Sequence, residues 1–402
     1  MSRALSVEEA LERVLAGAEP LAAESVAIEA ARGRVLAAPL AAKLTQPPFD
    51  ASAMDGFAVR KADIIKLPAT LAVIGQAAAG HPFDGSVGSG EAVRIFTGAP
   101  VPADADAIVI QEDTEHTPAQ VTVRAGPIET GHIRRRGFDF RTGDALLSAG
   151  RKLGPRELSL AAAMGHGTVS VHSRPLVGIL STGDELVAPG EQPRPGQIVS
   201  SNHLGVGALA ELAGADVRQL GIARDTRDSL TSHVAKAADC DILVTIGGAS
   251  VGDHDLVAPV LEARGMRLAF WKIALRPGKP LMFGRLGDTR VLGLPGNPVS
   301  ALVCSRVFLV PLIRRLAGLP DAEAGLATAR AAVPLDANGP RQHYMRATLH
   351  TGADGTPEAT PVRSQDSSLL SPLAMADCLL IRPPHAPAAP AGSSVPILPL
   401  DF

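Results

Sequence analysis

Polar and charged residues follow five predicted strands between residues 175 and 325, at the point where each strand ends. In an open α/β sheet, ligands bind in the crevice outside the carboxyl ends of the strands. We therefore expect these residues to converge on one site. They are Glu185 in "STGDEL", Asp225 in "RDT", Gly247, Gly248, Ser250 and Asp255 in "GGASVGDHD", Arg276 and Lys279 in "RPGKP", and Asn297 and Pro298 in "GLPGNPVS".

The residue types at these strand ends fit an anionic, phosphorylated ligand. Carboxylates suit Mg²⁺, which proteins bind through one or two acids together with substrate phosphates. Glycines after a strand let backbone N–H groups approach a phosphate, and a helix N-terminus adds partial positive charge. Arg276 and Lys279 suit a tetrahedral oxyanion. Each motif alone is typical of an ordinary turn, a helix cap or a solvated acid, but their combination at one sheet edge favours a ligand site.

A second candidate lies far from these motifs, in the stretch "SAMDGFAVR" that begins at Ser52. Asp55 and Gly56 are residues that a turn requires for its backbone conformation. Ser52, Met54 and Arg60 around them are not required by a turn. The sequence leaves two interpretations open here, an ordinary loop or an aspartate that faces a ligand.

Strands alternate with helices from residue 175 onward, which predicts a parallel sheet covered on both faces. Continuous apolar runs predict the strands, and polar starts followed by terminal glycines predict the helices. The predicted strands are 174–180, 216–223, 240–248, 268–275 and 290–296; the predicted helices are 200–214, 226–238, 256–265 and a long final helix over 297–318.

The remaining chain divides into three parts by the spacing of its apolar runs. Residues 47–145 contain short apolar runs separated by Gly, Pro and Asp, which predict a β-rich module. Residues 1–46 and 146–174 predict one discontinuous helical body, interrupted by that module, with Ser6 and Glu9 forming a capping box. The α/β domain then covers 175–325, and 326–402 predicts a small C-terminal β domain.

Composition excludes several function classes for this chain of 402 residues. Its formal net charge of −3 and lack of long basic runs argue against nucleic-acid binding. The three cysteines form no CxxC pair and predict buried, reduced side chains. We expect no zinc site, no membrane span and no signal peptide, and therefore a cytoplasmic protein.

Taken together, the motifs resemble those of the molybdopterin molybdenumtransferase family. The resemblance runs in order and spacing from about residue 5 to the C-terminus, and rests on "PPFDASAMDGFAVR", "GEAVRIFTGAPVPADADAIVIQED", "RRRGFD", "GILSTGDEL", "TIGGASVGDHD", "RPGKPLMFG" and "GLPGNPVSA". It implies a multidomain α/β fold whose third domain is doubly wound and similar to the molybdopterin adenylyltransferase MogA. It also implies an elongated homodimer and Mg²⁺-dependent insertion of molybdate into adenylylated molybdopterin, with release of AMP.

The resemblance assigns roles to individual residues. It places Asp55 and Thr97 in a cleft formed between subunits. Phe138 in "RRRGFD" and Arg276 in "RPGKP" depart from the family, where an acidic or small residue and a lysine, respectively, are common. The implied catalytic residues are Asp55, Thr97, Asp139, Glu185, Asp225 and Asp255, with Glu185 and Asp225 on Mg²⁺; the implied cofactor-binding residues are Gly247, Gly248, Ser250, Lys272, Arg276, Lys279, Pro295, Asn297, Pro298, Ser300, Arg341, Arg346 and Ser367.

The implied mechanism places molybdate on Arg276, Lys279 and Arg346, near the sulfurs of the pterin substrate. The three acids Glu185, Asp225 and Asp255 would position Mg²⁺ on the pyrophosphate, so that electrostatics and positioning dominate the reaction. Two alternatives remain, a molybdopterin adenylyltransferase and a non-catalytic scaffold similar to gephyrin. Contact with a molybdopterin adenylyltransferase and with apo-molybdoenzymes is also expected, but not with nucleic acid or membrane.

Overall fold

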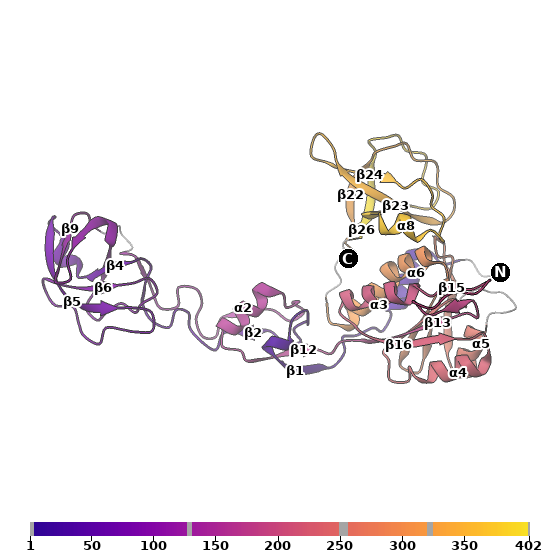
Figure 1. Ribbon diagram of the computed structural model, residues 1–402, viewed down its shortest axis with the longest axis horizontal. Helices are drawn as coiled ribbons and strands as arrows, with labels where there is room; N and C mark the ends of the chain where they lie inside the picture. The colour runs from indigo at the N-terminus through magenta and orange to yellow at the C-terminus, as the bar shows by residue number, and fades with distance from the viewer. Residues whose placement is uncertain (1–3, 127–130, 249–255, 320–324, 401–402) are drawn as a thin grey trace.

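The computed structural model describes residues 4–126, 131–248, 256–319 and 325–400. The molecule is elongated, with a β-rich module at one end and the α/β domain at the other (Figure 1). A small body joins them, and the C-terminal domain lies against the α/β domain (Figure 1). Within the described ranges, no helix combines the length and the apolar character that crossing a membrane requires.

The β-rich module is a six-stranded sheet in the order β7-β4-β6-β5-β9-β8. Its core includes Phe57, Leu71 and Val109, each at most 3% exposed. Strand β5 partly alternates between exposed and buried side chains, as expected for a sheet with one solvated face. The strands are β4 (Gly56–Val59), β5 (Ala69–Ala77), β6 (Glu91–Ile95), β7 (Ala107–Ile110), β8 (Thr114–His116) and β9 (Gln120–Val123).

The connecting body is built from two separate parts of the chain and is less helical than the sequence indicates. Antiparallel pairs β1–β12 and β2–β11 join segments before and after the module. The pair β3–β10 lies in the module itself, where Ile133 packs with Ala58 and Ile95. The elements of the body are β1 (Ala23–Ala27), β2 (Leu40–Ala41), β11 (Ala145–Leu147), β12 (Thr168–His172) and helix α2 (Pro155–Ala163), whereas β3 (Ala51–Ser52) and β10 (Ile133–Arg134) belong to the module.

Helix α1 (Val7–Leu15) begins at the predicted capping box, in which Ser6 Oγ accepts from the Glu9 N–H. Its buried residues Val7, Ala10 and Val14 pack into the core of the α/β domain, not into the connecting body. An amphipathic pattern specifies which face of a helix is buried, but it does not specify the partner. Helix α1, which the sequence assigned to the body over residues 1–46, therefore belongs to the core of the α/β domain.

The α/β sheet has the strand order β16-β13-β17-β21-β20-β18. Strands β16, β13, β17 and β21 are mutually parallel, as expected. Strand β20 pairs antiparallel with both β21 and β18, so the sheet is mixed and β20 alone runs in the opposite direction. Only two residues join β20 to β21, whereas a parallel connection requires a crossover of a dozen or more. The strands are β13 (Leu176–Thr182), β16 (Asp216–Ala223), β17 (Ile242–Ile246), β18 (Arg267–Lys272), β20 (Pro280–Leu286) and β21 (Thr289–Leu294).

Helices cover both faces of this sheet. The expected long final helix forms, but a π-helical turn over Ser305–Leu309 interrupts it. Pro311 follows this turn and has no N–H with which to continue regular bonding. The helices are α3 (Asn202–Ala213), α4 (Arg227–Ala235), α5 (Val257–Ala263), α6 (Pro298–Cys304) and α7 (Val310–Leu316).

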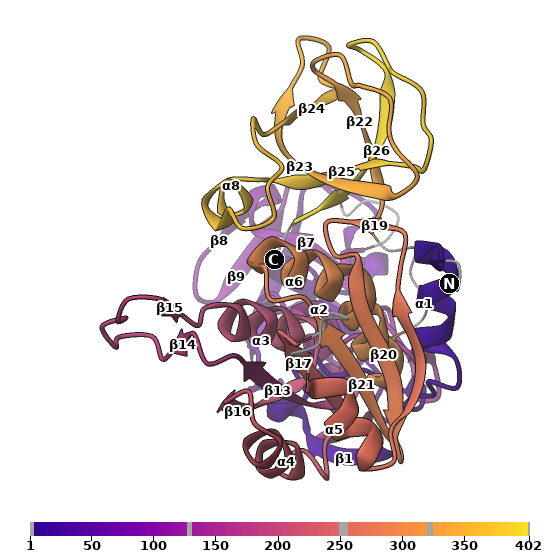
Figure 2. The same cartoon turned by 90° about the vertical axis from the view of Figure 1, so that its right-hand side faces the viewer.

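The C-terminal domain is a six-stranded sheet that includes a strand from the α/β domain. Strand β19 (Leu275–Arg276) pairs in parallel with β23, so the "RPGKP" loop joins both domains (Figure 2). The other elements are β22 (Ala327–Ala331), β23 (Gln342–Thr351), β24 (Pro357–Pro361), β25 (Cys378–Arg382), β26 (Ser394–Pro399) and the short helix α8 (Leu370–Ala374).

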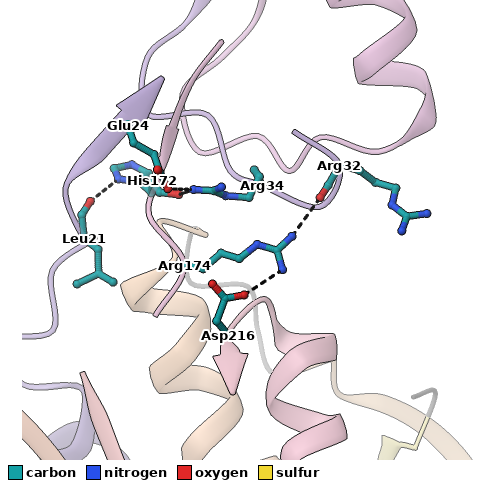
Figure 3. A network of polar contacts seen from close by, with 7 residues as sticks. All are labelled: Leu21, Glu24, Arg32, Arg34, His172, Arg174 and Asp216. Atoms are coloured by element: carbon teal, nitrogen blue, oxygen red, sulfur yellow. Dashed lines mark hydrogen bonds and ion pairs between the residues drawn. The ribbon is translucent and has the colours of Figure 1, made fainter. Parts of the chain in front are cut away.

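A polar network connects the body to the α/β domain, as Figure 3 shows. Arg174 forms an ion pair of 3.6 Å with Asp216 at the start of β16, and also donates to the Arg32 carbonyl at 3.5 Å. Arg34 forms an ion pair with Glu24 on β1. The contacts of Arg174 therefore join the body to the α/β domain, whereas the Arg34–Glu24 pair lies within the body.

Candidate functional site

A cavity of about 370 Å³ lies at the carboxyl edge of the parallel strands. It contains four of the predicted residues, Glu185, Gly247, Asn297 and Pro298, from the ends of three strands. Its remaining lining is a mixture of hydroxyl, amide and apolar side chains: Ser181, Thr182, Leu186, Ile198, Val199, Ser200, Ser201, Asn202, Ile246, Gly296 and Ser368. This combination suits a large ligand with both polar and apolar parts.

Close backbone packing shapes the wall of this first cavity. Gly247 has φ +92°, and a Cβ there would lie 2.7 Å from the Thr182 carbonyl oxygen. Only glycine fits this approach of two strand ends. Asn202 Nδ2 donates to the Gly296 carbonyl at 2.6 Å, which ties the start of α3 to the loop after β21.

A second cavity of about 380 Å³ adjoins the first, because Asn297 lines both. Its charged side chains are the cations Arg276, Lys279 and Arg341 and one acid, Asp366. The other lining residues are Pro277, Gly278, Pro280, Pro295, Ser300, Gln365 and Ser367. An excess of cations around a small cavity favours an anion.

The loop that carries Arg276 and Lys279 is held by close packing against helix α6. Gly278 has φ +108°, and a Cβ there would lie 2.4 Å from Cys304 Sγ, so no other residue fits. Strand β19, which directly precedes this loop, is part of the C-terminal sheet, where Arg276 is paired with His343. This pairing brings the cations of the α/β domain beside Arg341 of the C-terminal domain.

Ser367 links the two domains at the boundary between the cavities. Asn297 Nδ2 donates to Ser367 Oγ at 2.9 Å, and the Val299 N–H donates to the Ser367 carbonyl at 3.1 Å. A loop of the C-terminal domain thus accepts from the first turn of α6, where backbone donors otherwise lack partners. The two cavities are separated by a wall that both domains build.

Arg346 holds this loop from behind and does not line either cavity. The side chain is 1% exposed. Its Nη1 donates to the Leu369 carbonyl at 2.9 Å, and its Nη2 donates to the Ser364 and Asp366 carbonyls at 3.0 and 2.9 Å. The expectation that Arg346 holds molybdate is therefore corrected, because its guanidinium is occupied by backbone oxygens. Arg346 is a positioning residue for the loop that carries Ser367.

The predicted metal-binding acids lie near the first cavity. Glu185 is exposed and lines it. The Asp225 N–H donates to Asp184 Oδ1 at 3.2 Å, which brings the ends of β13 and β16 together. Among the described residues, no three His, Cys, Asp or Glu side chains form a metal cluster. Oxygen donors from one or two acids nevertheless match the chemistry of Mg²⁺, which also uses substrate phosphates and water.

Asp55 and Thr97 both lie on the β-rich module and contact each other. Asp55 Oδ1 accepts from the Thr97 N–H at 2.7 Å and from Thr97 Oγ1 at 2.8 Å. These bonds, the backbone bond first, lower the pKa of Asp55, and nearby Arg94 adds to the effect. Figure 1 shows that β4, which follows Asp55, lies at the opposite end of the molecule from the α/β sheet. One chain therefore does not bring Asp55 to the two cavities.

The other predicted residues are distributed as follows. Asp139 is exposed, and its N–H donates to the Gln46 carbonyl at 3.0 Å in the segment joining the module to the body. Gly248 and Lys272 are not among the lining residues of the two cavities. Ser250 and Asp255 lie outside the described residues.

Sequence reasoning missed several lining residues, including Ser200, Asn202 and Gln365. Asn202 starts a predicted helix at the correct edge of the sheet, and that position was a usable signal. Gln365 carries no comparable signal, because it reaches the cavity only through the docking of the C-terminal domain.

Comparison with known proteins gives one consistent assignment. Three family profiles match the chain: "MoeA N-terminal region (domain I and II)" over 5–165, "Probable molybdopterin binding domain" over 178–315, and "MoeA C-terminal region (domain IV)" over 328–400. A molybdopterin molybdenumtransferase from Haemophilus influenzae is 36% identical over 389 residues, which cover 95% of each chain. The chain belongs to the molybdopterin molybdenumtransferase family.

Other relatives agree with this family over nearly their whole length. A molybdopterin molybdenumtransferase from Bacillus subtilis is 33% identical and covers 98% of this chain and 94% of its own. The crystal structure of a molybdopterin biosynthesis MoeA protein from Pyrococcus horikosii superimposes with a TM-score of 0.83 at 30% identity, covering 100% of both chains. The family fold therefore extends through all parts of this chain, including the C-terminal β domain.

Proposed function

We propose that this chain is a molybdopterin molybdenumtransferase that inserts molybdate into adenylylated molybdopterin and releases AMP, forming the molybdenum cofactor. The observation that supports this most directly is the pair of adjoining cavities, one cationic and one mixed, that share Asn297. A reaction between a small oxyanion and a large nucleotide-bearing substrate requires two such sites side by side.

In this proposal the cationic cavity binds molybdate and the first cavity binds the pterin nucleotide. Arg276, Lys279 and Arg341 hold the tetrahedral dianion by charge-assisted hydrogen bonds. The first cavity holds the pterin nucleotide, with the glycine backbone at Gly247 beside its phosphates. Glu185 and Asp225, with Asp255, would hold Mg²⁺. When bound, Mg²⁺ supplies charge neutralisation to the pyrophosphate.

Asp55 and Thr97 enter the site from a second copy of the chain. This part of the proposal rests on the distance between the β-rich module and the α/β sheet within one chain. A homodimer with the site between subunits would bring the Asp55–Thr97 pair, and Asp139 near it, to the cavities. Cytoplasmic location and contact with an adenylyltransferase and apo-molybdoenzymes belong to the same proposal.

The test is AMP release from adenylylated molybdopterin, with and without Mg²⁺ and with and without molybdate. Release that requires molybdate, with a product that activates an apo-molybdoenzyme, supports the transferase. The variants Arg276→Ala and Lys279→Ala each remove one charged contact and should raise the molybdate KM by roughly tenfold to a hundredfold. Arg330→Ala is the matched control, because Arg330 is exposed, forms an ion pair with Asp354 and lines neither cavity.

Other outcomes favour other functions. Consumption of ATP on unmodified molybdopterin, without AMP release from the adenylylated form, would move the chain to the adenylyltransferases. Absence of both activities, with tight binding of a peptide partner, would favour a scaffold.

A further inference from the structure

His343 is a buried histidine beside the cationic cavity that the proposed mechanism does not use. It lies on β23 and is 7% exposed. Its Nε2 is buried and has no hydrogen-bond partner in the described part of the chain. Buried polar side-chain atoms usually have a partner, so an unpaired imidazole nitrogen requires a physical explanation.

Cations surround His343 on each strand that adjoins it. Arg276 on β19 and Arg382 on β25 are its register partners, so the three side chains share one face of the sheet. Arg341 precedes it by two residues, and Arg346 follows it by three. Two of these cations, Arg276 and Arg341, also line the cavity.

Among the residues that the structure describes, the other charged residues lining this cavity are Lys279 and Asp366. Lys279 adds another positive charge. Asp366 Oδ1 accepts from the Ser368 N–H and hydroxyl, so this carboxylate is engaged with its own loop. The cluster around His343 therefore has a net positive charge when the cavity holds no anion.

These surroundings keep the imidazole neutral. Burial first, and then the charges of Arg276, Arg341 and Arg346, together lower the pKa of His343 to about 4. An anion bound between Arg276 and Arg341 offsets the positive charge of both arginines. It therefore favours the protonated form of His343. By thermodynamic linkage, protonation of His343 strengthens anion binding by the same factor by which the bound anion favours protonation.

We propose that His343 lets this cavity distinguish a doubly charged tetrahedral oxyanion from a singly charged one, by accepting a proton from solvent when the dianion binds. The inference rests on the proposed function, since it concerns the same oxyanion cavity. His343 does not contact the anion in this proposal. It is a specificity-determining residue that acts through the charges of Arg276 and Arg341.

The size of the effect follows from the linkage. At a pH between the free and the bound pKa of His343, each unit by which the bound pKa exceeds the pH corresponds to an about tenfold gain in affinity. A dianion exerts twice the field of a monoanion of the same shape, so it gains more. We expect the preference for the dianion to grow as the pH falls from about 8 to about 6, where histidine titration becomes accessible.

The experiment compares tungstate with perrhenate, two tetrahedral oxyanions of similar size that carry two charges and one charge. Calorimetric titration of the full chain in buffers of different ionisation enthalpy gives the Kd and the number of protons taken up. The His343→Gln variant keeps a polar side chain but does not titrate. His350→Gln, on an exposed residue of the same strand, is the matched control.

The wild type and His350→Gln should take up a fraction of a proton with tungstate at about pH 6, and less with perrhenate. His343→Gln should take up none, and its preference for tungstate should fall several-fold, on the order of the linkage above. Equal proton counts or equal preferences in the wild type and His343→Gln would overturn the proposal. If His343→Gln does not fold, tungstate binding without proton uptake in the wild type overturns it.

The same data separate this inference from the proposed function. Tungstate binding with proton uptake, but without molybdate-dependent AMP release, would support the role of His343 and overturn the proposed transferase activity. AMP release without proton uptake supports the transferase and overturns the role of His343. Absence of tungstate binding overturns both.

Discussion

Replacement of Arg346 by methionine should loosen the loop that separates the two cavities. Methionine keeps most of the volume of the buried side chain but donates no hydrogen bonds. Three bonds are lost, to the Ser364, Asp366 and Leu369 carbonyls. Ser367, between these acceptors, then loses the support that places its hydroxyl on Asn297.

The magnitude follows from those three bonds. At a net value of about 1 kcal/mol each, the local opening of the loop becomes easier by roughly 3 kcal/mol. Removal of a buried charge offsets part of this loss, because burial already lowers the pKa of Arg346. Since 1.4 kcal/mol corresponds to a factor of ten, protected amides in the loop should exchange up to about 10² times faster.

Hydrogen exchange of the segment 362–369, followed by mass spectrometry, measures this opening directly. The Val362 N–H is a suitable probe, since it donates to the Arg346 carbonyl at 2.9 Å. Arg363→Met, on an exposed arginine of the same loop, is the control and should leave exchange unchanged. Unchanged exchange in Arg346→Met, with an unchanged tungstate Kd, would refute the positioning role.

Three further predictions concern the site. Gly278→Ala should lower the free energy of unfolding by about 1–3 kcal/mol and weaken oxyanion binding. Gly287→Ala, also at positive φ but with open space around it, should lower the free energy of unfolding less. Thermal unfolding of both variants measures the difference. Because the pKa of Asp55 is lowered, its contact with Thr97 should persist through neutral pH and be lost only as the pH falls through that lowered value. Carboxyl NMR titration of the wild type checks this. An ordinary aspartate pKa for Asp55 would contradict it. Glu185→Ala should leave the fold intact but slow AMP release by on the order of 10²–10³, and a variant with full turnover would remove Glu185 from the mechanism.

Much of the α/β domain is readable from local sequence. Continuous apolar runs and glycine-terminated helices depend on residues close together in the chain, and the structure places β13, β16, β17 and β21 where those patterns indicate. The strand ends carrying Glu185, Gly247 and Asn297 do meet at one edge. This follows from the parallel arrangement of the strands, which brings their carboxyl ends together.

Contacts between distant segments were decided only by tertiary packing. The amphipathic face of α1 did not reveal that it packs on the α/β core. No local pattern revealed that the guanidinium of Arg346 turns toward backbone carbonyls. Likewise, the pairing of β19 with β23 makes one cationic cavity from Arg276 and Arg341, which are 65 residues apart. Periodicity and turn chemistry are local properties of a sequence, whereas the partner of a buried surface depends on which other surfaces the whole chain offers.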